Sequence, residues 1–226
     1  MIGHIEIPRE VPVMTLSDTV LFPQAILPLY IFEPRYRAML EEVLNGDRIF
    51  AIAALDEGAP AERELETPHA VAGIGIVRAC QKNPDGTSNL LLQGLARVCL
   101  DDIVSEKPFR RARVRQVLTS PGGSEEALSA IKPKLLDLIR TQIRLGARIP
   151  NEVLEFLANV EVPEIFLDLA ISTLCHEGRL KQRLLETTEV IARYRRFIGF
   201  LRSEIERLKL ERKLQGELDD DAFGNN

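Results

Sequence analysis

The chain of 226 residues is long enough for one large domain or two small ones, each with its own hydrophobic core. Hydrophobic residues make up 45% and charged residues 28%, which excludes an intrinsically disordered chain. The formal net charge of -5 argues against a general nucleic-acid-binding protein, because phosphate contacts need a basic surface.

The cellular compartment is suggested by the cysteines and the N-terminus. Cys80, Cys99 and Cys175 are odd in number, widely spaced and without a CxxC pair, so we expect small core residues in a reducing compartment. Residues 1–9 lack the apolar region of a signal peptide, and no run of about 18 apolar residues occurs. These features predict a cytoplasmic protein without a membrane segment.

The first half of the chain begins with strand-forming sequence. Residues 11–16 and 26–31 are predicted strands, and prolines at 23 and 28 place the second one at a sheet edge, since proline cannot donate to a ladder. Apolar residues three and four apart predict a short amphipathic helix over 35–44. A buried strand over 48–55 and a polar loop over 56–69 follow.

Further strands follow this loop. Asn83-Pro-Asp-Gly86 lies between apolar segments at 71–81 and 88–94, as in a β-turn where proline sets one dihedral and glycine takes the positive one. Segments 95–100 and 111–118 continue the β pattern. We therefore expect a small curved sheet or barrel with one inserted helix.

The pattern changes after the break at residues 120–124, and helical spacing dominates the rest of the chain. The predicted helices cover about 131–143, with a kink at Pro133, and then 152–158, 164–174, 180–185 and 189–214. We expect a β subdomain over 1–119, a helical subdomain over 120–215 and a disordered acidic tail over 216–226.

Catalytic, metal and cofactor motifs are not recognisable in the sequence. His4, His69 and His176 are isolated, so a metal site is not supported, and no phosphate-binding GxxxxGK[ST] loop is present. Gly73 and Gly75 lie inside a strand pattern and are interpreted as close-packing glycines. No nucleophilic serine elbow or Cys–His pair is evident. We expect no enzyme activity and no cofactor.

A short basic run is the one feature that favours nucleic acid. Its members are Arg110, Arg111, Arg113 and Arg115. They alternate along a predicted strand, so a solvated face is the preferred interpretation and an RNA-binding surface the alternative.

Several motifs in order resemble the N-terminal domain of Lon proteases. They are residues 13–23, where Thr15 replaces a usual proline, and 26–37, 73–77, 83–87, 91–97, 180–186 and 204–210. The resemblance covers about residues 10–214. It implies an α+β fold, with a PUA-like β pseudo-barrel with one inserted helix, followed by a C-terminal helical bundle ending in a long helix.

The resemblance also implies a function. A stand-alone, non-catalytic module would bind unfolded, damaged or extended polypeptides, or act as an adaptor for a Lon-type or other ATP-dependent protease. The alternative is an RNA-binding PUA-like domain, which the acidic composition disfavours.

The expected binding surface lies near the edge strand and the first helix. Tyr30, Phe32, Tyr36 and Met39 are its apolar candidates, although the preferred interpretation is that most of them are core residues. Its expected rim is Glu33, Arg35 and Arg37.

The long C-terminal helix carries an apolar seam with 3–4 spacing. We expect packing within the chain along its first half and free projection or pairing beyond Leu208. The chain is then a monomer or a weak homodimer through this helix, with Arg193, Arg195, Arg196 and Glu204 flanking the contact.

Overall fold

The computed structural model describes residues 6–58 and 66–222, with side chains described up to residue 215. The chain divides into two compact units. The β unit comprises Met1–Thr119 and Asp168–Thr188, and the helical unit comprises Ser120–Leu167 and Glu189–Asn226. The boundary after residue 119 agrees with the expected division, but residues 168–188 belong with the β unit and not with the other helices.

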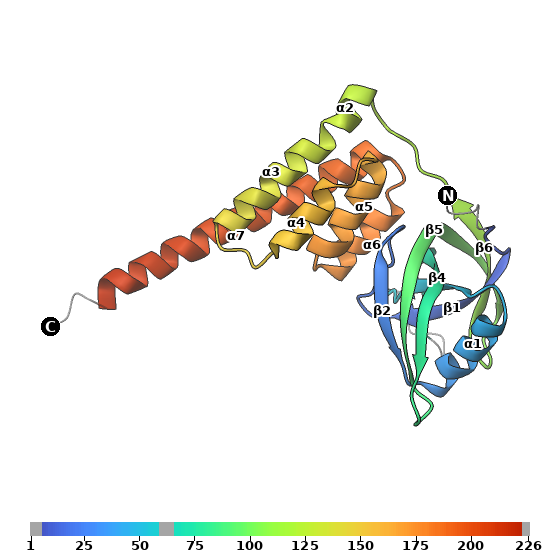
Figure 1. Cartoon of the computed structure of the whole chain (residues 1–226). Helices are drawn as coiled ribbons and strands as arrows, with labels where there is room; N and C mark the ends of the chain where they lie inside the picture. The colour runs from blue at the N-terminus through green and yellow to red at the C-terminus, as the bar shows by residue number, and fades with distance from the viewer. Residues whose placement is uncertain (1–5, 59–65, 223–226) are drawn as a thin grey trace. The chain divides into compact units, whose positions relative to one another are not determined.

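The β unit is built on one mixed sheet (Figure 1). Its strands are β1 (Glu10–Leu16), β2 (Ile26–Ile31), β3 (Ile49–Ala54), β4 (Val71–Lys82), β5 (Ser88–Ser105) and β6 (Arg111–Val117), and helix α1 (Pro34–Asn45) lies between β2 and β3 in sequence. The strand order is β2-β5-β4-β3-β1-β6, and β6 also pairs with β5. The sheet therefore closes on itself, which confirms the α+β class and the pseudo-barrel with one inserted helix.

Strand β5 is longer than the sequence suggested. Its first half pairs with β2 and its second half with β6, while β4 runs along much of its other side. Register shifts in both the β4 and β6 pairings interrupt the ladder, and such bulges increase local twist. The predicted turn joins β4 to β5: the Gly86 N–H donates to the Asn83 carbonyl at 3.0 Å, with Gly86 at φ 82°.

Two glycines let the segment between β1 and β2 lie directly on the sheet. A Cβ atom at Gly73 would lie 2.0 Å from the Leu21 carbonyl oxygen, and one at Gly94 would lie 2.0 Å from the Phe22 carbonyl oxygen. The interpretation of Gly73 as a close-packing strand glycine is therefore confirmed. Leu21 and Phe22 are buried as a result.

The β unit contains two buried apolar clusters. One includes Tyr36, Met39 and Phe50 and joins the inner face of α1 to the sheet. The other includes Ile74 and Val98 from the central strands. The segments with near-continuous apolar sequence are thus buried on both faces, as expected for strands inside a closed sheet.

A buried ion pair holds residues 168–188 to the β unit. Arg97 on β5 donates to both carboxylate oxygens of Asp168 on α5 (Pro163–Leu174), at 2.8 and 2.7 Å. The two side chains are only 2% and 1% exposed. The Arg97 Nε atom donates to the Leu185 carbonyl on α6 (Gly178–Glu186) at 3.0 Å. These bonds explain why this helical segment groups with the strands.

The helical unit contains α2 (Glu125–Ser129), α3 (Ile131–Arg144), α4 (Asn151–Ala158), the start of α5 and α7 (Val190–Ala222). Helix α2 was not expected, and the Ser124 hydroxyl caps it by accepting from the Ala127 N–H. Pro133 lies in the first turn of α3, where its missing N–H is not needed. Helices α3 and α7 are linked by Gln142, which donates to the Leu201 carbonyl at 3.2 Å.

The apolar side chains of helix α7 are buried along its first half and exposed near its end. Phe197, Leu201 and Ile205 are buried, whereas Leu210 and Leu214 are exposed. This confirms packing along the first half and exposure beyond Leu208. Arg193 is fully buried, so it cannot flank a dimer contact as expected.

The tail expected to be disordered from residue 216 is helical through Ala222. A single glycine at 216 costs a helix only about 1 kcal/mol, and helix-forming residues surround it. Residues 223–226 lie outside the described part of the chain.

We predict that Asp168→Asn will lower the free energy of unfolding by about 3–5 kcal/mol, because it removes the carboxylate charge that pairs with the buried Arg97 guanidinium. Asp102→Asn is the matched control, since Asp102 pairs with Arg113 in solvent, and it should cost less than about 1 kcal/mol. Urea unfolding followed by circular dichroism measures both. Equal losses would show that the buried pair does not stabilise the fold.

Replacing Leu201 by alanine should cost about 2–5 kcal/mol, because its side chain is 1% exposed. Leu214→Ala on the same helix should cost less than about 0.5 kcal/mol, because that side chain is 50% exposed. Thermal and urea unfolding of the two variants provide the comparison. A loss below about 0.5 kcal/mol for Leu201→Ala would contradict the packing of α7.

Candidate functional site

Apolar side chains gather on the outer face of β2 and its neighbour β5. Ile26, Tyr30, Phe32 and Leu91 are between 42% and 59% exposed, and we name these four residues the β2 surface. Ile26 and Tyr30 point to the same side of β2, and Leu91 lies directly opposite Pro28 in the register. The Tyr30 and Phe32 rings are stacked, with centroids 5.9 Å apart. Clustered exposed apolar groups of this kind mark interaction sites.

The β2 surface lies beside a free sheet edge. Among the described strands β2 pairs with β5 only and is the terminal strand of the sheet order. An edge strand presents backbone donors and acceptors to an incoming chain, although Pro28 contributes no N–H. The predicted position of residues 26–31 at an edge is confirmed.

The expected binding residues divide into two groups. Tyr30 and Phe32 are exposed on the β2 surface, but Tyr36 and Met39 are 5% and 0% exposed. The amphipathic spacing of α1 turns these two toward the sheet, so they support the surface from the core and do not form it. The Tyr36 hydroxyl donates to the Thr15 carbonyl at 3.0 Å. Burial raises the pKa of the Tyr36 phenol above its ordinary value.

The three expected rim residues follow β2 in sequence. The Arg35 Nε atom lies 2.8 Å from a Glu33 carboxylate oxygen, and its Nη atoms reach Glu66 at 3.3 Å. The guanidinium of Arg35 also covers the Tyr36 ring, at 4.5 Å from its centroid. Arg37 lies against the turn at Gly86, where a Cβ atom would be 2.0 Å from its Nη2 atom. The Arg35 guanidinium is thus paired with carboxylates, and the Arg37 side chain is packed against the turn.

Sequence reasoning missed Ile26 and Leu91 as surface residues. A signal was present for Leu91, because Leu90-Leu91-Leu92 lies in a strand, and successive side chains of a strand alternate between faces. Leu90 and Leu92 are buried and Leu91 is exposed, as this alternation requires.

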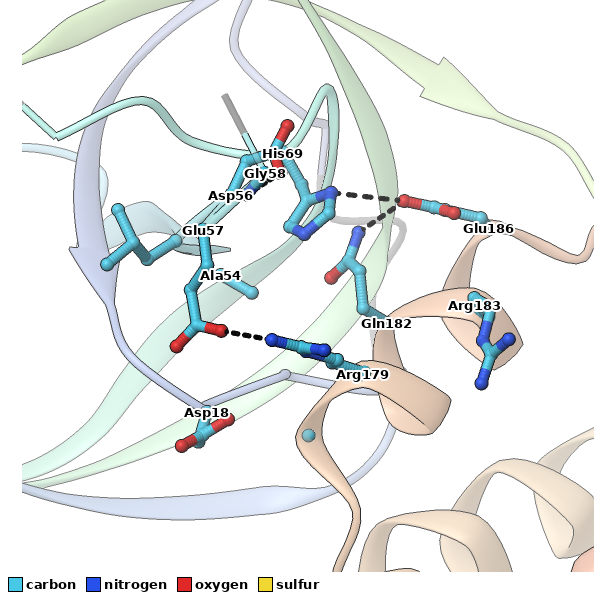
Figure 2. Close-up of a pocket in the computed structure, with 12 residues that line it drawn as sticks. Asp18, Ala54, Asp56, Glu57, Gly58, His69, Arg179, Gln182, Arg183 and Glu186 are labelled. Atoms are coloured by element: carbon cyan, nitrogen blue, oxygen red, sulfur yellow. Dashed lines mark hydrogen bonds and ion pairs between the residues drawn. The ribbon is translucent and has the colours of Figure 1, made fainter. Parts of the chain in front are cut away.

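A pocket of about 520 Å³ lies in the β unit between the end of β3 and helix α6 (Figure 2). Gln182 Nε2 donates to the Val71 carbonyl at 2.9 Å and to Glu186 Oε1 at 2.8 Å. His69 Nδ1 lies 3.6 Å from the same Glu186 oxygen, and Arg179 pairs with Glu57 at 2.9 Å. The sequence did not single out this pocket, since its residues come from distant segments.

The basic run on β6 is neutralised by carboxylates. Arg110 pairs with Glu106, Arg111 with Glu10 and Glu42, Arg113 with Asp102, and Arg115 with Asp101. The prediction of a solvated face is confirmed for Arg113 and Arg115, which are exposed. Arg110 is instead buried and donates to the Thr15 hydroxyl. Arginines that already contact carboxylates are poorly available to phosphates, so this run does not strengthen the RNA alternative.

The described residues offer neither a metal cluster nor a membrane-spanning helix. Among the described side chains, in residues 6–58 and 66–215, no three His, Cys, Asp or Glu groups lie so that they could hold a metal ion. No helix in those ranges has the length and apolar character needed to cross a bilayer. The three cysteines are free thiols, of which Cys175 is buried.

Comparison with known proteins identifies relatives along almost the whole chain. The family model described as ATP-dependent protease La (LON) substrate-binding domain matches residues 10–203. "Lon protease" of Desulfosudis oleivorans is 27% identical over 220 residues, covering 96% of this chain and 26% of the relative. "Lon protease 2" of Herpetosiphon aurantiacus is 30% identical over 209 residues, covering 92% and 26%. The chain thus spans about a quarter of the length of these relatives.

Two solved structures share the fold. The N-terminal domain of Mycobacterium avium complex Lon protease superimposes with a TM-score of 0.65 at 18% identity, covering 87% of this chain and 98% of that domain. The Lon N-terminal domain protein from Xanthomonas campestris gives a TM-score of 0.58 at 16% identity, covering 84% and 97%.

The burial of Tyr36 predicts a response to alkaline pH. Because its folded pKa is raised, its contribution to stability is present below the ordinary tyrosine value of about 10 and is lost as pH rises through the raised pKa. In an alkaline titration of tyrosinate absorbance, Tyr36→Phe should reduce the component that titrates above pH about 10. Leu214→Ala, which alters an exposed side chain and no tyrosine, should leave that component intact. An unchanged component in Tyr36→Phe would contradict the buried phenol.

Proposed function

Because the chain belongs to the family of LON substrate-binding domains, we propose that it binds unfolded or extended polypeptide segments through the β2 surface. The observation that carries this proposal is the stacked, exposed pair Tyr30 and Phe32 at a free sheet edge. A folded protein hides its apolar side chains, whereas an unfolded one presents them together with unpaired backbone groups. The surface complements both features of an unfolded chain.

The chemistry of the surface sets the expected affinity. Apolar contact with four side chains leaves only a modest net binding free energy after the entropy cost of association is subtracted. Binding in the micromolar range or weaker is therefore expected. Apolar burial is not screened by ions, so salt should change the affinity little. A phosphate-binding mode would instead lose affinity steeply as salt rises.

The proposed role is substrate recognition for proteolysis, with no catalytic step. The 226 residues contain no GxxxxGK[ST] loop that could bind the phosphates of ATP. Unfolding and cleavage would therefore be performed by an ATP-dependent protease that receives the bound polypeptide, in the cytoplasm. A Lon-type protease is the partner that the family suggests.

Titration of labelled unfolded casein tests this function. Tyr30→Ala and Phe32→Ala should each weaken binding about tenfold, as expected for an aromatic contact residue that contributes about 1.4 kcal/mol. Phe156→Ala is the matched control, because Phe156 is another exposed aromatic residue but lies on α4 of the helical unit. It should leave the affinity unchanged.

Two results would contradict the proposal. Equal affinity for casein and for a stably folded protein would mean that unfolded chains are not recognised. Affinity that disappears at moderate salt would indicate an electrostatic mode of binding.

A further inference from the structure

The pocket between the end of β3 and α6 has features that binding at the β2 surface does not explain. Its volume of about 520 Å³ is in the range of small-ligand sites and suits a single side chain or small molecule. Its walls carry four carboxylates, on Asp18, Asp56, Glu57 and Glu186, against the guanidinium groups of Arg179 and Arg183. The four carboxylates outnumber the two guanidinium groups and the one imidazole of the wall together, so the pocket has an excess of negative charge.

One polar atom in the pocket wall lacks a partner. Gln182 is 2% exposed, and its Oε1 atom is buried and accepts no hydrogen bond from the described residues. Its amide orientation is fixed, because Nε2 must donate to two acceptors, the Val71 carbonyl and the Glu186 carboxylate. The oxygen is thus held on the opposite side of the amide, where it requires a donor.

The arrangement around Gln182 favours a donor that is also positively charged. Figure 2 shows Gln182 and His69 beside Glu186, with Arg183 pointing away from this group. Arg179 is already paired with Glu57. A cation in the pocket would donate to the amide oxygen while the carboxylates of the pocket wall, Glu186 among them, supply countercharge. Hydrogen bonds with an ionised donor are stronger than those between neutral groups.

We propose that this pocket binds one cationic N–H donor group: a lysine ammonium, an arginine guanidinium or the amino terminus of a polypeptide. The unsatisfied Gln182 oxygen accepts one hydrogen bond from the ligand, and Glu186 and Asp18 supply the countercharge. This inference does not depend on the β2 surface, because the two sites share no residue.

Small amides test the pocket without engaging a long apolar surface. The probes are N-acetyl-lysine amide, N-acetyl-arginine amide and glycinamide, which separate the three sources of the cation, and N-acetyl-norleucine amide, which is the uncharged control. Binding is followed by NMR of the full chain, using the side-chain amide resonances of Gln182. We expect at least one cationic probe to shift these resonances and to bind about tenfold more tightly than the norleucine amide.

Two variants remove pocket charge with little structural change. Glu186→Gln keeps an oxygen that can accept from Gln182, and Asp18→Asn keeps a residue type that tolerates the φ of 52° at this position. Each should lower the affinity for the cationic probe by about threefold or more. Asp47→Asn, which changes an exposed carboxylate outside the pocket, should leave that affinity unchanged.

Three results would overturn the inference. They are a norleucine amide that binds as tightly as the cations, pocket variants that behave like Asp47→Asn, and Gln182 resonances that no cationic probe shifts at millimolar concentration. The casein experiment is independent of these outcomes, so failure of one proposal is distinguishable from failure of the other.

Discussion

The buried pair of Arg97 and Asp168 is the constraint on which the β unit depends. A guanidinium inside a protein is tolerated only when its donors are satisfied, and here two go to the carboxylate and one to the Leu185 carbonyl. The Phe22 ring covers the same guanidinium, with its centroid 5.7 Å away. One side chain on β5 thereby contacts Asp168, the end of α6 and the segment before β2, all within the β unit.

Most elements could be predicted from local sequence because their signals are local. The 3–4 spacing of α1, the Pro-Asp-Gly turn before β5 and the prolines around β2 each act through neighbouring residues. The grouping of residues 168–188 with the strands could not be predicted this way. It depends on Arg97 meeting a residue 71 positions away, and the sequence alone gives no sign of that contact.

The residues of the candidate sites could be predicted from the sequence only in part. The periodicity of a strand or a helix identifies which side chains share a face, but not whether that face is covered, so Tyr30 on β2 and Tyr36 on α1 were both candidates for the surface. The pocket beside α6 was not recognisable at all, because Asp18, His69 and Gln182 lie far apart along the chain. The arginine run illustrates the opposite error, since a stripe that looks basic in sequence is matched by acidic partners on neighbouring segments.

The two units interleave along the chain, and this has a consequence for biosynthesis. The β unit is interrupted after Thr119 and resumes at Asp168 within α5, so its last part is translated after much of the helical unit. The Asp168 carboxylate and the Leu185 carbonyl, which bind the Arg97 guanidinium in the folded chain, leave the ribosome only after all the strands have been translated. Formation of the complete β unit therefore has to wait until residues 168–188 have been translated.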